Sequence, residues 1–166
     1  MVKKVFVLLL ICFFAFCLSG CKKKIPENWY EETIDFYREG FATDWKNAPA
    51  NYTICDEQKD KNNKFGYLLK DLDGDGINEL FIGIIDDSSE TKFTDLIIYH
   101  NDFGPHRSFA AGNEYYLYIC DGSTIRNDYW YGSETRSQYM KYDSENNSFP
   151  EVDGGSKPQK IELMEF

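Results

Sequence analysis

A run of acidic residues and glycines between two apolar segments has the residue types needed to bind an ion. Carboxylates stand at positions 1, 3, 5 and 9 of this run, at Asp71, Asp73, Asp75 and Glu79. Such crowding of negative charge is unfavourable unless solvent or a cation screens it. Gly74 and Gly76 permit the positive φ angles of a tightly curled backbone, which can turn the first three carboxylates inward. The carbonyl of Ile77 can add an oxygen, and hard divalent cations bind six to eight oxygens.

The same run carries a resemblance to known calcium loops of the Asp-x-Asp-x-Asp-Gly type. Its first six positions look like an EF-hand loop, but position 12 is Ile82, where an EF-hand has a bidentate Glu. The flanking segments, residues 66–69 and 80–85, are typical of strands rather than helices. A strand–loop–strand unit of this kind is similar to the calcium loops of FG-GAP and VCBS-type repeats.

This resemblance implies a structural calcium site and no reaction. The ligands that it implies are Asp71, Asp73, Asp75, Ile77 and Glu79. The alternatives are an acidic, glycine-rich hairpin turn that binds no ion and a site for another cation. Since the bidentate Glu is absent, we expect weak binding, in the range of about 10⁻⁴–10⁻³ M that extracellular calcium modules commonly show.

The start of the chain is typical of a secretory signal. A basic start at residues 1–4 precedes thirteen apolar residues, Val5–Cys17, which form a helix too short for a hydrocarbon core of about 30 Å. The following Leu18-Ser19-Gly20-Cys21 resembles the lipobox of bacterial lipoproteins. This resemblance implies a signal peptide over residues 1–20 and acylation, with palmitate-type chains, of the Cys21 thiol.

A lipidated Cys21 places the protein at the extracytoplasmic face of a cell membrane, with the bilayer as its first partner. Residues 21–26 then form a short tether, in which Lys22–Lys24 can meet anionic headgroups. The lipobox and the acidic loop together look like those of small surface lipoproteins of clostridia-type bacteria.

Two cysteines remain beyond the signal and the lipid-bearing position. Cys55 and Cys120 form an even pair in a compartment that permits disulfides. A bridge between them would close a loop of about 65 residues and stabilise the fold by about 4 kcal/mol in the chain-entropy model. The alternative is that both are small, buried, apolar residues with free thiols.

The charge of the chain argues against one class of partner. The sequence has 18 basic and 28 acidic residues, a net charge of −10. Residues 21–166 alone carry 16 basic and 28 acidic residues, or −12. Binding to nucleic acid requires clustered cations, so we expect no nucleic-acid partner.

The order of elements predicts one α+β domain over residues 27–166. Apolar residues at helical spacing predict an amphipathic helix over residues 27–45, packed on an antiparallel β-meander that contains the calcium-loop hairpin. The expected strands are 51–55, 65–70, 79–85, 93–99, 115–120, 124–131, 136–142 and 159–165.

No enzyme motif stands out in this chain, and we expect no catalytic activity. Neither a Gly-x-Ser-x-Gly elbow nor a Walker loop occurs. Aromatic residues gather instead in the later strands, notably Tyr115 and residues 129–131, where an exposed set could contact a protein or a glycan. The sequence therefore favours a calcium-binding surface lipoprotein that acts as a non-catalytic binding or accessory module. The alternative is an envelope hydrolase whose active site the sequence does not reveal.

Overall fold

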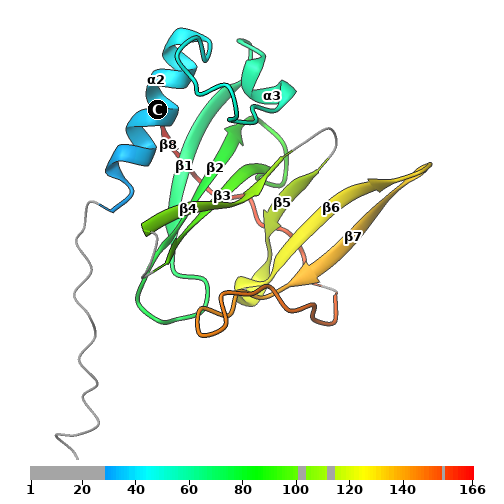
Figure 1. Ribbon diagram of the computed structural model, residues 1–166. Helices are drawn as coiled ribbons and strands as arrows, with labels where there is room; N and C mark the ends of the chain where they lie inside the picture. The colour runs from blue at the N-terminus through cyan, green and yellow to red at the C-terminus, as the bar shows by residue number, and fades with distance from the viewer. Residues whose placement is uncertain (1–28, 101–103, 112–114, 155) are drawn as a thin grey trace, which may run out of the picture.

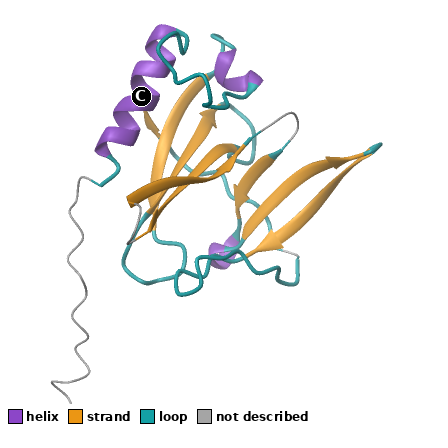
Figure 2. Ribbon diagram, in the orientation of Figure 1, coloured by secondary structure: helices purple, strands orange, loops and turns teal. Residues whose placement is uncertain are grey.

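The computed structural model describes residues 29–100, 104–111, 115–154 and 156–166, which form mainly one large antiparallel sheet (Figures 1 and 2). Its eight strands are β1 (Lys64–Lys70), β2 (Glu79–Ile85), β3 (Phe93–His100), β4 (Gly104–Ala110), β5 (Tyr116–Ile119), β6 (Ile125–Tyr131), β7 (Glu134–Met140) and β8 (Met164–Glu165). The helices are α2 (Glu31–Thr43), the four-residue α3 (Asp56–Lys59) and a single 3₁₀ turn, η1 (Asp121–Ser123).

The predicted fold class is wrong. The described part of the chain is dominated by its eight-stranded sheet, to which two short α-helices are added, and it is not a helix-plus-sheet fold built on an N-terminal amphipathic helix. The prediction failed because helical spacing in one segment says nothing about how large a sheet the rest of the chain forms. The predicted signal peptide, Cys21 and the tether lie outside the described residues.

Two individual strand predictions also need correction, and one strand was not predicted. Residues 51–55 form no strand and lead directly into α3. Of residues 159–165, only the last two belong to a strand, β8. The strand β4 was missed, because its sequence Gly-Pro-His-Arg-Ser-Phe-Ala lacks apolar alternation and contains two residues typical of turns.

The order of strands in the sheet is β7-β6-β5-β3-β2-β1-β8, and β4 pairs with β3 beside β5. All of these pairs are antiparallel. The sheet twists strongly, so β6 and β7 form a hairpin that projects away from β1–β4 (Figure 1).

The central strand β2 is buried on both faces. Its first six residues are buried, and its sequence Glu-Leu-Phe-Ile-Gly-Ile-Ile is an almost continuous apolar run. Leu80 and Ile82 join the apolar cluster on the side of α2, while Phe81 joins the cluster on the opposite side of the sheet. Glu79 is the first residue of this strand, and its side chain therefore lies where water is excluded.

Aromatic side chains attach α2 to the sheet. Tyr37 of this helix is 1% exposed, and Phe41 stacks on Phe65 of β1 with ring centroids 4.4 Å apart. The helix ends at Thr43, and the N–H of Trp45 donates to the carbonyl of Gly40 at 2.8 Å. A side chain at Gly40 would collide with the Trp45 ring, because an added Cβ would lie 2.4 Å from it. The glycine thus lets the chain fold back onto its own helix.

A buried ion pair lies between the helical layer and the sheet. Asp95 of β3 is completely buried and pairs with Arg107 of β4. Gln58 of α3 donates to the hydroxyl of Thr94 at 3.1 Å and also bonds to Asp95. The Arg107 guanidinium donates to the carbonyl of Thr53 at 2.7 Å, so this pair ties α3 and its preceding loop to two strands.

We expect Arg107→Ala to lower the free energy of unfolding at neutral pH by about 3–5 kcal/mol, because it leaves the buried Asp95 carboxylate without a positive partner. Urea unfolding measures this change. The control is Arg38→Ala, which removes an exposed ion pair with Asp35 and should change stability little. Equal effects of the two variants would contradict the assignment of a structural role to the buried pair.

Candidate metal centre

The acidic run forms the loop of the β1–β2 hairpin. Lys70, the last residue of β1, pairs directly with Glu79, the first residue of β2, so residues 71–78 close the hairpin. Gly74 and Gly76 have φ angles of 83° and 89°, in the region that other residues rarely adopt. The two glycines therefore allow the curled backbone that the sequence predicts.

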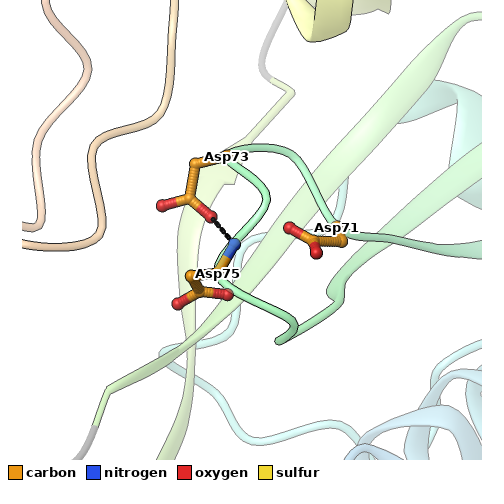
Figure 3. A group of neighbouring side chains, drawn as sticks. All are labelled: Asp71, Asp73 and Asp75. Carbon is orange, nitrogen blue, oxygen red and sulfur yellow. Dashed lines mark hydrogen bonds between the residues drawn. The ribbon is translucent and has the colours of Figure 1, made fainter. Parts of the chain in front are cut away.

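Three carboxylates of this loop come together. One oxygen from each of Asp71, Asp73 and Asp75 lies within 4.8 Å of the others, and Figure 3 shows the three side chains around the same curl of backbone. Among the described residues this is the group of His, Cys, Asp or Glu side chains that could hold a metal ion.

Backbone N–H groups of the loop hold these carboxylates in place. The two oxygens of Asp71 accept from the N–H groups of Gly74 and Gly76, at 2.7 and 2.9 Å. One oxygen of Asp73 accepts from the N–H of Asp75 at 3.2 Å, the bond drawn in Figure 3. A carboxylate oxygen has two lone pairs, so each still has capacity to coordinate a cation. The backbone of the loop itself therefore holds the carboxylates close together.

A distant segment also contacts the loop. The N–H of Ser144 donates to the second oxygen of Asp73 at 3.1 Å, across 71 positions of sequence. Ser144 lies in the turn that follows β7, where the bridge between Asp143 and Ser148 closes residues 144–147. Figure 1 shows this turn beside the β1–β2 loop. The acidic loop is thus held against the chain that leaves the β6–β7 hairpin.

Glu79 occupies a different environment from the three aspartates. Its side chain is 2% exposed, and one of its oxygens accepts from the backbone N–H of Leu72 at 2.8 Å. Burial is the largest cause that raises the pKa of this carboxyl, and together with the negative charges of Asp73, Asp75 and Asp71 it raises the pKa to about 8. No ion pair to Glu79 is present among the described residues. This buried carboxyl therefore requires a proton or a nearby cation.

The remaining predicted ligand, Ile77, ends the curl. Its N–H donates to a carboxylate oxygen of Asp75 at 2.7 Å. Burial and the charges of Asp73 and Asp71 raise the pKa of Asp75. A cleft of about 530 Å³ adjoins this end of the loop. It is lined by Asp75, Ile77 and Glu79 on one side and by Tyr142, Ser144 and Glu145 on another.

The last three of these residues were not identified from the sequence. Residues 144–147 have a composition typical of a turn, and turn residues alone do not show which other loop they contact. The pairing depends on how the β6–β7 hairpin returns to the sheet, for which no local signal exists.

The two remaining cysteines are free and buried in this structure, so the described chain has the second of the two arrangements considered above. Cys55 precedes α3, and Cys120 follows β5. Burial raises the pKa of the Cys55 thiol to about 12, and burial also raises the pKa of the Cys120 thiol. Both thiols are therefore protonated at neutral pH and are poor nucleophiles.

The later strands expose part of their aromatic surface. Tyr115, Trp130 and Tyr131 are 40%, 44% and 59% exposed. Tyr115 stacks with Tyr129, and the Arg136 guanidinium lies 4.0 Å from the centre of the Tyr131 ring. Exposed aromatic groups with polar neighbours are typical of contact surfaces.

The described helices are all too short or too polar to cross a bilayer. This finding concerns residues 29–100, 104–111, 115–154 and 156–166, and the apolar start of the chain is not among them.

The pKa of Glu79 leads to a prediction about pH. In the presence of a chelator, we expect the free energy of unfolding to fall as pH rises from about 5 to about 8, because the folded state holds a proton that the unfolded state has released. The contribution of Glu79 is fully present below its ordinary pKa of 4.5 and is lost above about 8. Urea unfolding at several pH values measures it.

The variant Glu79→Gln carries no titrating group and should have a flatter profile over this pH range. The exposed Glu162→Gln provides a control that should follow the wild type. Parallel profiles for the wild type and Glu79→Gln would show that Glu79 does not titrate in this way.

The chain was compared with known protein families, curated proteins and solved structures. No family model, no curated protein and no solved structure matches the chain.

Proposed function

We propose that this protein is a calcium-binding lipoprotein, anchored at the extracytoplasmic face of a cell membrane, that serves as a non-catalytic binding or accessory module. The observation that carries the calcium assignment is the convergence of three aspartates beside the buried carboxyl of Glu79. Four acidic groups in one hairpin, with no positive side chain paired to Glu79 among the described residues, favour a divalent cation as the missing partner.

The chemistry of the loop favours calcium over magnesium. The donors are carboxylate oxygens, with the carbonyl of Ile77 as a further candidate, and calcium accepts six to eight oxygens in flexible geometry. Magnesium requires near-ideal octahedral order and retains several waters. The two glycines in a long hairpin loop suit the more tolerant ion.

A bound cation would stabilise the fold at a sensitive place. It would offset the repulsion among the aspartates and lower the pKa of Glu79, because a nearby positive charge favours the ionised form. The loop also holds Ser144, so a structural ion would fix the β1–β2 hairpin and the turn after β7 together. A structural role of this kind suits a surface module better than the role of a reversible calcium sensor does.

The membrane anchor rests on the lipobox at Leu18–Cys21, and the contact surface on the exposed aromatics of the later strands. A diacylated Cys21 would hold the folded domain near the bilayer, because each buried methylene contributes about 0.8 kcal/mol. We assign Tyr115, Trp130 and Tyr131 to contacts with a protein or glycan partner. The net charge of −10 leaves nucleic acid out of this proposal.

Calcium should stabilise the folded chain. At 100 times the dissociation constant it should add about 2.7 kcal/mol to the free energy of unfolding, seen as a rise of several degrees in the unfolding temperature relative to chelator. Asp73→Ala and Asp75→Ala should abolish this rise, whereas Asp87→Ala, in an exposed acidic turn, should retain it. An unfolding temperature of the wild type that is the same with calcium and with chelator would overturn the calcium assignment.

The anchor can be tested separately by metabolic labelling with palmitate in a bacterial host. The wild-type chain should incorporate the label and partition into a detergent phase, and Cys21→Ala should do neither. Cys17→Ala, within the apolar segment, serves as the control and should remain labelled. Labelled Cys21→Ala protein, or an unlabelled wild type, would remove the lipoprotein assignment and leave the calcium site unaffected.

A further inference from the structure

The outer edge of β7 is open over most of its length. This strand is the last in the sheet and pairs only with β6. The returning chain covers its final part, where the N–H of Val152 donates to the carbonyl of Tyr139 at 2.9 Å and the N–H of Lys141 donates to that of Pro150 at 3.1 Å. Within the described residues, the backbone of residues 134–138 makes no hydrogen bond on this side, although the Gln138 side chain donates to Glu151 at 3.4 Å.

The other edges of the sheet are protected. At the opposite end, β8 is only two residues long. The strand β4 contains Pro105, which has no N–H to donate. In contrast, β7 has seven residues, with neither proline nor glycine, and its first four residues are exposed. A long unprotected edge is a template for another strand.

The hydrogen bonds on the covered part of the edge show which N–H and carbonyl groups of β7 point away from β6. The bonds made by Tyr139 and Lys141 point outward, and outward groups alternate along a strand. No register shift interrupts the pairing of β7 with β6. Thr135 and Ser137 therefore direct their N–H and carbonyl groups outward as well, ready for an antiparallel neighbour.

The charges on this edge are self-complementary. Glu134 and Arg136 stand on either side of Thr135, with exposed side chains of opposite charge. Arg136 lies against Tyr131 and bonds to Glu134 of its own chain at 2.8 Å, which holds the guanidinium over this face of the hairpin. If an identical strand is reversed about Thr135, each negative charge faces a positive one.

We propose that the outer edge of β7 binds the same edge of a second copy of this chain, antiparallel, about a two-fold axis at Thr135. Thr135 then exchanges backbone hydrogen bonds with the partner's Thr135. Glu134 lies opposite the partner's Arg136 in a non-hydrogen-bonded position, where side chains are closest. The arrangement is isologous, so the same ion pair forms twice, once on each side of the two-fold axis.

A second copy is favoured over another peptide because of the order of the charges along the edge. When two identical strands run antiparallel about Thr135, each negative side chain lies opposite a positive one. A register centred on Ser137 instead would place residue 135 opposite Tyr139, whose carbonyl already accepts from the N–H of Val152. The axis at Thr135 is therefore the one that uses the open part of the edge and pairs unlike charges.

A charge-swap experiment tests this register. Two differently tagged versions of the full chain are mixed in detergent solution over a wide range of concentrations, and capture through one tag measures association with the other. Glu134→Arg and Arg136→Glu should each lower self-association about tenfold, because both ion pairs become like-charge pairs. The Glu134→Arg chain mixed with the Arg136→Glu chain should associate like the wild type, since the introduced charges are again opposite.

A matched control uses the exposed ion pair at the other end of the sheet, Lys64 with Glu165 at 3.7 Å. Lys64→Glu and Glu165→Arg should leave association unchanged. All the altered side chains are exposed, and unfolding midpoints will verify that each variant folds. Absence of association by the wild type, equal loss in the control variants, or no recovery in the mixed pair would each overturn the proposal.

Discussion

The carboxyl group of Glu79 lies at the point where an acidic loop meets the centre of the sheet. Because β2 is packed on both faces, the side chain of its first residue, Glu79, is buried. A buried carboxylate needs a proton or a cation. Three aspartates within the same hairpin increase that need. The proposed calcium site follows from this constraint, since one divalent ion would satisfy the loop and the buried carboxyl together.

The sheet connects this site to the rest of the molecule. One face of β2 supports the aromatic layer of α2, and the other supports the core shared with β5 and β6. The turn after β7 then returns to the acidic loop through Ser144. An ion at the loop would therefore act on contacts between the hairpin and a segment that lies far away in sequence, and not on the hairpin alone.

The two ends of the sheet have different surroundings. The β1 end is closed by β8 and the helical layer, whereas the β6–β7 hairpin projects with exposed aromatics and an open edge (Figure 1). In the proposed function, the hairpin would contact a partner through its aromatics and a second copy through its edge. The acidic loop, which lies in another hairpin of the sheet, would then serve stability.

The sequence by itself determined the strong local features. Short β-type runs between turn residues located β1, β2, β3, β5, β6 and β7, and the Asp and Gly spacing placed three carboxylates around one curl, because both depend on neighbours only a few residues apart. It did not determine β4, whose Pro and charged residues act as a strand only beside β3, nor the dominance of the sheet over the helix. Tertiary structure alone decided that Glu79 is buried, that Ser144 meets Asp73 and that both cysteines remain free. Desolvation and long-range contacts depend on what packs around a residue, and that information is not contained in the spacing of the residues beside it.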